Sequence, residues 1–223
     1  MRKPAFLSHE RAAAAPENWM TATQVLHLVL GEDGAGASAV RGKTILWHAG
    51  ASGVSSAGIQ LALAAGASAV YATAGSQDKL DFITARLGAT AAFNYKTQDW
   101  VAEVQAHTGG RGVDCIVDFV GADYFQKNLE AAARDGKIAI LGTMSGRMAP
   151  QIDVGLVLYK RLRVQGSSLR SRDVEKLSEY VPDFESGKLT IYLDSVFPCE
   201  KIQEAHGHME DAKNSGKIVC TIP

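Results

Sequence analysis

The chain has 223 residues, a length typical of one large domain or of one domain with a smaller piece. Its formal net charge is −1 at pH 7, so bulk electrostatics favour neither nucleic acid nor an anionic membrane as a partner. No apolar run reaches the length that spans a bilayer, and we expect no membrane partner. The three cysteines are far apart and form no CxxC motif, which favours a reducing compartment and a cytoplasmic location.

The first predicted element is an amphipathic helix over residues 17–30. Its apolar residues follow the spacing i, i+3, i+4, i+7 from Ala22 to Val29, which places them on one face of a helix. Pro16 precedes the segment and Gly31 ends it, and both are typical boundary residues.

Short apolar strands alternate with helices from residue 44 onward. Strands are predicted at 44–49, 69–74, 91–95, 113–120, 136–141 and 162–167, and helices at 54–66, 78–88, 99–109, 123–134 and 154–159. The strands are continuous apolar runs, as in a parallel sheet that is covered on both faces. We therefore predict an α/β fold, a Rossmann-type doubly wound sheet of six parallel strands.

The last part of the chain has a different character. Helices are predicted at 171–188 and 199–215, an extended segment at 191–198 and a final strand at 216–222. We therefore divide the chain into an N-terminal segment, a dinucleotide-binding domain and a C-terminal helix and strand extension, with boundaries at 1–42, 43–170 and 171–223.

A turn of small residues follows the first strand of the predicted sheet. The turn Gly50-Ala51-Ser52-Gly53-Val54-Ser55 has glycine at its first and fourth positions only, whereas the GxGxxG pattern of dinucleotide-binding turns has glycine at the first, third and sixth. Its place between the first strand and first helix of a βαβ unit favours phosphate binding by backbone N–H groups. The alternative is a strand–helix turn whose small residues serve packing. The Ser55 side chain either crowds the phosphates or forms a hydrogen bond with one.

The end of the second strand indicates which cofactor binds. NAD-specific folds carry an acidic residue there, about 20 residues beyond the glycines, but residues 54–77 contain none. Ser76 can donate to a 2′-phosphate and Lys79 can neutralise it, which favours NADPH over NADH. In the alternative interpretation, Lys79 is a solvated residue in the first turn of a helix, beside Asp78.

Further candidate residues lie at the ends of later strands. Tyr95 either covers the adenine, reaches the 2′-phosphate or simply packs. Gly121 and Gly142 allow the backbone to approach a nicotinamide, or they only form turns. His48 ends a buried strand and is interpreted as a satisfied polar group.

No metal site is predicted. His206 and Glu210 are four residues apart and can share a helix face, whereas His208 cannot share a face with His206. Two candidate ligands without a third do not make a site.

Taken together, the sequence resembles the zinc-free NADPH:quinone oxidoreductases of the medium-chain dehydrogenase/reductase superfamily. The resemblance is greatest to the zeta-crystallin-like and tumour-suppressor-inducible branch, and it runs from about residue 12 to the end. The segments that carry it are PENWMTATQVLH, HAGASGV, TAGSQDKL, FNYKTQD, GVDCIVDFVGADYFQKNL, LVLYKRLRVQGSSLRSRD and EAHGHMEDAKNSGKIV.

The resemblance implies a set of cofactor-binding residues and names no catalytic one. It places Ser52, Gly53 and Val54 on the pyrophosphate, and Gly75, Ser76, Lys79 and Tyr95 around the 2′-phosphate. It places at the ribose and nicotinamide Val120, Gly121, Leu141, Gly142 and Thr143, and near the nicotinamide edge Ser168, Leu169 and Arg170. It further implies that Asn214 approaches the cofactor from the C-terminal segment. It also implies a homodimer formed through the edge strand 163–167, whose few charges suit such pairing.

The sequence departs from the family in two respects. The family usually has glycine at the position of Ser55. It also begins with a GroES-like substrate domain, whereas 43 residues precede the first sheet strand here. We therefore interpret residues 1–42 as a linker helix with a remnant of that domain, and expect residues 171–223 to pack on the part that is missing.

These features leave two functions from different classes. The first is an NADPH-dependent oxidoreductase that transfers a hydride to a quinone or a similar conjugated carbonyl acceptor, incomplete in this chain. An enoyl or alkenal reductase differs from it only in the acceptor, while a zinc alcohol dehydrogenase is disfavoured because no ligand set is present. The second is a non-catalytic NADPH-binding module or a degenerate remnant.

Overall fold

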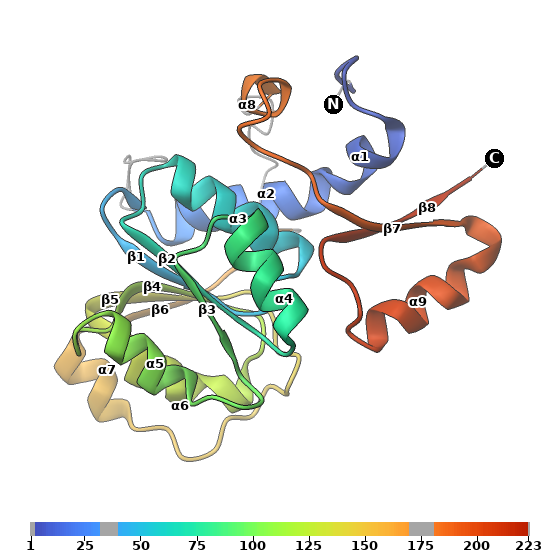
Figure 1. The fold of residues 1–223 in the computed structure, drawn as a ribbon. Helices are drawn as coiled ribbons and strands as arrows, with labels where there is room; N and C mark the ends of the chain where they lie inside the picture. Colours follow the sequence, from blue (N-terminus) through green and yellow to red (C-terminus); the bar gives the residue numbers. More distant parts are fainter. Residues whose placement is uncertain (1–2, 32–39, 170–180, 223) are drawn as a thin grey trace.

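The computed structural model describes residues 3–31, 40–169 and 181–222. A six-stranded parallel sheet lies at its centre, with the strand order β3-β2-β1-β4-β5-β6 (Figure 1). This order confirms the predicted doubly wound α/β fold, and β1 and β4 lie side by side at its centre. The strands are β1 Thr44–Trp47, β2 Ala69–Ala74, β3 Ala91–Asn94, β4 Val113–Asp118, β5 Ala132–Ile140 and β6 Arg163–Gly166.

Helices cover both faces of this sheet (Figure 1). On one face lie α2 Pro16–Gln24, its π-helical continuation Val25–Val29, α3 Gly53–Ala64, and α4 Gln77–Asp81 with its π-helical continuation Phe82–Arg86. On the other face lie α5 Trp100–His107, α6 Ala122–Ala131 and α7 Val154–Lys160. Each face has its own cluster of buried apolar side chains, which explains why the central strands are apolar along their whole length.

Several helices begin where a short polar side chain caps the first turn. Ser52 accepts a hydrogen bond from the backbone of α3, Asp99 from α5 and Asp153 from α7. Helix α2 instead begins at Pro16, a residue that loses nothing at the first helical position.

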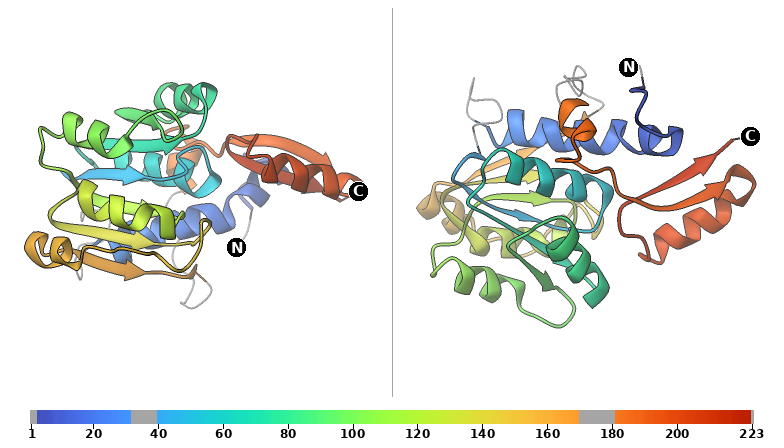
Figure 2. Two further views of the ribbon diagram at one scale, coloured as in Figure 1. Left: turned by 90° about the horizontal axis from the view of Figure 1, so that it is seen from below. Right: turned by 45° about the horizontal axis from the view of Figure 1, so that its top comes forward.

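The C-terminal extension forms a second, smaller unit that projects beyond the main sheet (Figure 2). Strands β7 Leu193–Pro198 and β8 Lys217–Thr221 are parallel and are connected by a 3₁₀ turn at Cys199–Lys201 and helix α9 Ile202–Glu210. A short helix that the sequence analysis missed, α1 His9–Ala14, packs against β8. Helix α8 Val181–Glu185 contacts α2 through Phe184 and Trp19 (ring centroids 4.6 Å apart).

Some predicted boundaries were wrong. The helix predicted at 123–134 ends at Ala131, because Ala132 already pairs with Val113 of β4. The chain then makes an irregular excursion, with Asp135 at a φ of 63°, before Lys137 pairs with Cys115. The predicted strand 44–49 ends at Trp47. Residues 171–180, which make up most of the helix predicted at 171–188, lie outside the described residues.

None of the described helices is long and apolar enough to cross a bilayer.

Candidate functional site

The turn between β1 and α3 lies at the carboxyl ends of the strands, beside β4. The chain reverses there through Ala49, whose φ of 48° is unusual for a residue with a side chain. Ser52 then caps α3, and its Oγ accepts a hydrogen bond from Ser55 N (3.3 Å). The N–H groups of Gly53 and Val54 belong to the first helical turn, where no intrahelical acceptor is available. This arrangement can bind an anion such as a phosphate.

Both glycines of this turn are also required by packing. A methyl group added at Gly50 would lie 2.7 Å from Ala72 Cβ, and one added at Gly53 would lie 2.5 Å from Asn18 Nδ2. The packing interpretation of the turn is therefore supported for Gly50 and Gly53. This packing role is compatible with phosphate binding. The glycine Cα atoms make the close contacts, whereas the backbone N–H groups of the first helical turn would bind the phosphate.

The Ser55 side chain has a partner inside the protein. Ser55 is fully buried, and its Oγ donates a hydrogen bond to the carbonyl oxygen of His48 (2.9 Å). Its backbone N–H is bound to Ser52. Both polar groups of Ser55 are thus bonded within the protein, and its assigned contact with phosphate stays a prediction.

The residues predicted for the 2′-phosphate lie near one another at the ends of β2 and β3. A methyl group added at Gly75 would lie 2.7 Å from Tyr95 Oη, and Ser76 begins α4 without making a capping hydrogen bond. Lys79 Nζ donates to the carbonyl oxygen of Ala212 (2.6 Å). The four residues predicted to surround the 2′-phosphate thus lie at the same edge of the sheet.

A second cation in this region was missed by the sequence analysis. Lys96 follows Tyr95, and its Cε would lie 3.1 Å from a methyl group added at Gly75. Burial lowers the pKa of the Lys79 ammonium; Asp194 opposes this shift and Lys96 adds to it. The sequence contained a signal for it, because Lys96 directly follows the predicted strand 91–95 and is adjacent to Tyr95, which was already a candidate for the 2′-phosphate site.

The loops after β4 and β5 interlock, and they contain the residues predicted to lie at the ribose and nicotinamide. Leu141 N donates to Asp118 O (2.7 Å), so the two loops are joined directly. A methyl group added at Gly121 would lie 2.9 Å from Gly146 O, and one added at Gly142 would lie 2.9 Å from Phe119 O. Val120 and Thr143 lie in the same pair of loops, where Ser145 N donates to Val120 O and Gly146 N donates to Thr143 O.

A buried network of hydrogen bonds connects the end of β1 with the loop after β4. His48 bonds through Nδ1 to Thr73 Oγ1 (3.0 Å) and through Nε2 to Asn128 Oδ1 (2.7 Å). Asn128 in turn donates to the Asp118 carboxylate (3.0 Å), which also accepts from Val120 N (2.7 Å). Burial lowers the pKa of His48 to about 4, so the imidazole is neutral at pH 7.

This network confirms that His48 is a satisfied polar group. Asp118 and Asn128 were missed by the sequence analysis. The available signal was an acidic residue inside an apolar strand, which needs a buried partner.

The loop before β8 crosses the turn between β1 and α3. Gly216 N donates to Ala51 O (2.9 Å), and Asn214 Nδ2 donates to Gly216 O (3.1 Å). Asp194 holds the same loop by accepting from Ser215 N (2.7 Å) and from His208 Nε2 (2.8 Å). Asn214 therefore lies in the loop that contacts the turn, and its approach to the cofactor stays a prediction.

The remaining predicted residues follow β6. Ser168 is exposed and Leu169 is half-buried, and both come directly after the edge strand. Arg170 lies outside the described residues. Within the described ranges, no three His, Cys, Asp or Glu side chains are grouped so that they could bind a metal ion. His208 of α9 is paired with Asp194 of β7.

The fold, together with the turn between β1 and α3, defines a Rossmann-type α/β protein of the nucleotide-binding class. The sequence model described as zinc-binding dehydrogenase matches residues 53–184, more than half of the chain. The chain belongs to this family, within the medium-chain dehydrogenase/reductase superfamily.

Three similar proteins extend this comparison. Quinone oxidoreductase-like protein 2 of Bos taurus is 27% identical over 98% of this chain and 62% of its own length. A crystal structure of an NAD-dependent alcohol dehydrogenase is 38% identical with a TM-score of 0.85, over 100% of this chain and 62% of the other. A mycobacterial protein complexed with NADPH is 26% identical with a TM-score of 0.82, over 98% and 68%. The chain spans about half to two thirds of the length of three curated relatives that it matches, and 9% of the length of a much longer one.

Proposed function

We propose that this chain is the NADPH-binding part of an oxidoreductase that transfers a hydride to a quinone or a similar conjugated carbonyl compound. One observation carries the proposal: the first turn of α3 offers the N–H groups of Gly53 and Val54 beside the centre of a Rossmann-type sheet. The name of the bovine relative supports a quinone as the acceptor class. An enone is the alternative acceptor, since both are reduced by hydride addition to a conjugated system.

The choice of NADPH rests on the end of β2. Residues 54–77 contain no acid that could bind a ribose 2′-hydroxyl and repel a phosphate. Lys79 and Lys96 lie beside Gly75 and Tyr95 in the same region. Lys79 currently donates to a neutral carbonyl oxygen, so it can turn to a phosphate without leaving a carboxylate unpaired.

The residues of this chain bind and orient the cofactor, and NADPH, when bound, supplies the hydride. Ser52, Gly53 and Val54 are proposed to hold the pyrophosphate, and the interlocked loops after β4 and β5 to hold the ribose and nicotinamide. The close approach of Gly121 and Gly142 to the backbone fixes these loops, which keeps the nicotinamide in one orientation. The described residues supply no zinc ligand set, and the proposal routes no step through a metal.

Calorimetric titration of the chain with NADPH and, separately, with NADH tests the proposal. We expect NADPH to bind more tightly than NADH. Lys79→Gln is expected to weaken NADPH on the order of 10- to 100-fold and to leave NADH unchanged, because only NADPH carries the 2′-phosphate. Lys127→Gln, a change at an exposed lysine of α6, is the matched control.

The titration also separates the alternatives. Tighter binding of NADH would assign the chain to the cofactor named for its neighbour at 38% identity. Absence of binding to either cofactor by a folded chain would overturn the proposal. Binding without reduction of a quinone, either alone or with the preceding domain of a longer relative, would support a non-catalytic NADPH-binding module.

Two partner surfaces are proposed with this function. All four residues of the edge strand β6 are exposed, which supports a homodimer formed by pairing of this strand with a second copy. Val196, Ile202 and Met209 leave apolar surface on the C-terminal unit, which supports its packing on a further domain. Analytical ultracentrifugation of the chain and of Val164→Lys tests the dimer, because a lysine on the edge should yield a monomer.

A further inference from the structure

Two adjoining cavities lie at the amino end of the sheet, opposite the edge that carries the candidate dinucleotide site. Their volumes are about 480 and 470 Å³, and Lys137 and Arg163 line both of them. Leu28, Val29 and Gly31, at the end of the α2 segment, form one wall of the first cavity. Cavities of this size fall within the usual range of small-molecule sites.

Five cationic side chains line the second cavity, two of them also line the first, and the strand register explains why they lie together. Lys137 of β5 pairs with Arg163 of β6, so two like charges are direct cross-strand neighbours. Arg134 lies in the irregular excursion at the start of β5, and Arg161 precedes β6. The fifth is Lys43, just before β1. Like charges opposite each other in a sheet destabilise it unless an anion compensates them.

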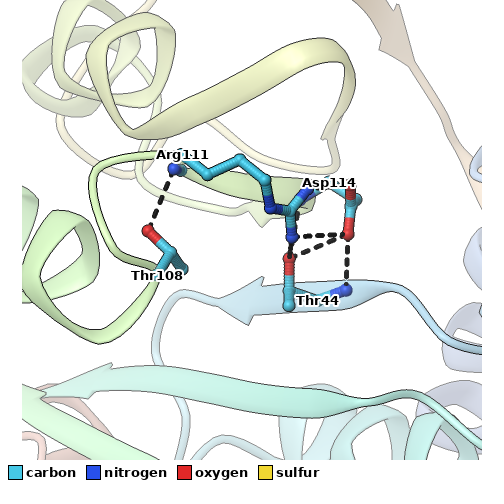
Figure 3. A network of polar contacts seen from close by, with 5 residues as sticks. Thr44, Thr108, Arg111 and Asp114 are labelled. Carbon is cyan, nitrogen blue, oxygen red and sulfur yellow. Dashed lines mark hydrogen bonds and ion pairs between the residues drawn. The ribbon is translucent and has the colours of Figure 1, made fainter.

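The acidic residues of the second cavity are already paired. The Arg161 guanidinium donates to the Asp135 carboxylate (Nε to Oδ1, 2.7 Å). The Asp114 carboxylate accepts from Arg111 Nη1 (2.6 Å) and from Thr44 N (2.7 Å), as Figure 3 shows. Burial raises the pKa of Asp114, but these hydrogen bonds bring it below its usual value, so the group is ionised and held in place.

The remaining groups leave positive charge in the cavities. Burial raises the pKa of the Cys115 thiol to about 12, so this lining residue is neutral at pH 7. Lys137 Nζ donates to the carbonyl oxygens of Leu30 (2.9 Å) and Gly31 (3.0 Å), neither of which carries a formal charge. Among the ion pairs of the described residues, none contains Lys43, Arg134 or Arg163, although Asp135 attracts both arginines at longer range.

We propose that these cavities form a second anion site, distinct from the dinucleotide cleft, that binds a small phosphate-bearing molecule. Arg134 and Arg163 present guanidinium groups that match phosphate oxygens, while Lys43 and Lys137 supply compact charges. The cavity volumes of about 480 and 470 Å³ and the net charge of −1 for the whole chain fit a small molecule better than a nucleic acid.

Calorimetric titration with inorganic pyrophosphate at low salt tests the site, with NADPH present to occupy the dinucleotide cleft. The wild-type chain is expected to bind, and Arg134→Gln/Arg163→Gln to bind about tenfold or more weakly, because two charge-assisted contacts are lost. The control Arg11→Gln/Arg86→Gln removes the same charge from exposed positions elsewhere and should bind as the wild type does. Circular dichroism melting confirms that all three chains are folded.

Two results would overturn this inference. One is a wild-type chain that gives no binding heat, and the other is an equal loss of affinity in both double variants. Lys79→Gln separates this site from the dinucleotide cleft: pyrophosphate should bind this variant unchanged even if NADPH does not bind at all. A single-stranded oligonucleotide that binds and depends equally on Arg134 and Arg163 would replace the small-molecule site with a nucleic-acid surface.

Discussion

The two sheets of the molecule differ in how completely they are buried. In β4 of the large sheet every residue except Asp114 is buried, whereas in β7 of the small sheet none is. The large sheet is covered by helices on both faces, while β7 and β8 pack mainly against α1 and α9 (Figure 1). Among the described residues, the large sheet therefore contributes most of the buried core, and the small sheet keeps partly exposed apolar side chains such as Val196.

The largest expected difference between the two sheets is in the loss of unfolding free energy when one buried or exposed β-branched side chain is truncated to alanine. Ile116→Ala in β4 removes a fully buried side chain and should lower the free energy of unfolding by about 2–5 kcal/mol. Val196→Ala in β7 removes a side chain that is 46% exposed and should change it by within about 0.5 kcal/mol. Urea unfolding monitored by circular dichroism measures both. A comparable loss for Val196→Ala would show that β7 is covered in solution.

The buried network gives the large sheet a pH dependence. The pKa of His48 is lowered to about 4 by burial, against 6.5 for an exposed histidine, so the unfolded chain binds this proton more readily. The contribution of His48 to stability is therefore greatest above pH 6.5 and is lost as the pH falls toward 4, by about 3 kcal/mol in total. Burial raises the pKa of Asp118 in the same network, which acts in the opposite direction. Urea unfolding between pH 7 and 5 measures this loss.

The matched variants for this measurement are His48→Gln and His9→Gln. His48→Gln should lower stability at pH 7, where it disturbs the buried hydrogen bonds, and should remove most of the loss between pH 7 and 5, because the titrating group is gone. His9 is exposed at the start of α1, and its replacement should leave the pH dependence as in the wild type. An unchanged pH dependence in His48→Gln would assign the loss to other groups.

The doubly wound parallel sheet could be predicted from sequence because local signals and burial agree in the large sheet. Continuous apolar runs predicted buried parallel strands, and Ser52, Asp99 and Asp153 began helices close to the predicted positions. The error at Ala132 has a different origin. Its place in β5 is set by pairing with Val113, a contact that no local pattern contains.

The candidate site shows the same limit. Residues that follow β1, β2, β4 and β5 could be expected at one edge of the sheet, because the strands are parallel and their carboxyl ends share that edge. Their partner atoms could not be predicted. The contact of Gly216 with Ala51, and the chain of hydrogen bonds from His48 to Asp118, join segments that are far apart in sequence.

The smallest predicted effect concerns Ser55, at the turn where the small unit contacts the large one. Ser55→Ala removes the hydrogen bond to His48 O and should lower stability by about 1 kcal/mol. The affinity for NADPH should stay within about twofold, because the hydroxyl faces the protein and the Gly53 and Val54 N–H groups are untouched. Ser55→Gly should add about 1 kcal/mol of destabilisation, the penalty of glycine inside a helix, again at unchanged affinity. A clear loss of affinity in Ser55→Ala would instead show that the hydroxyl turns toward the phosphate when the cofactor binds.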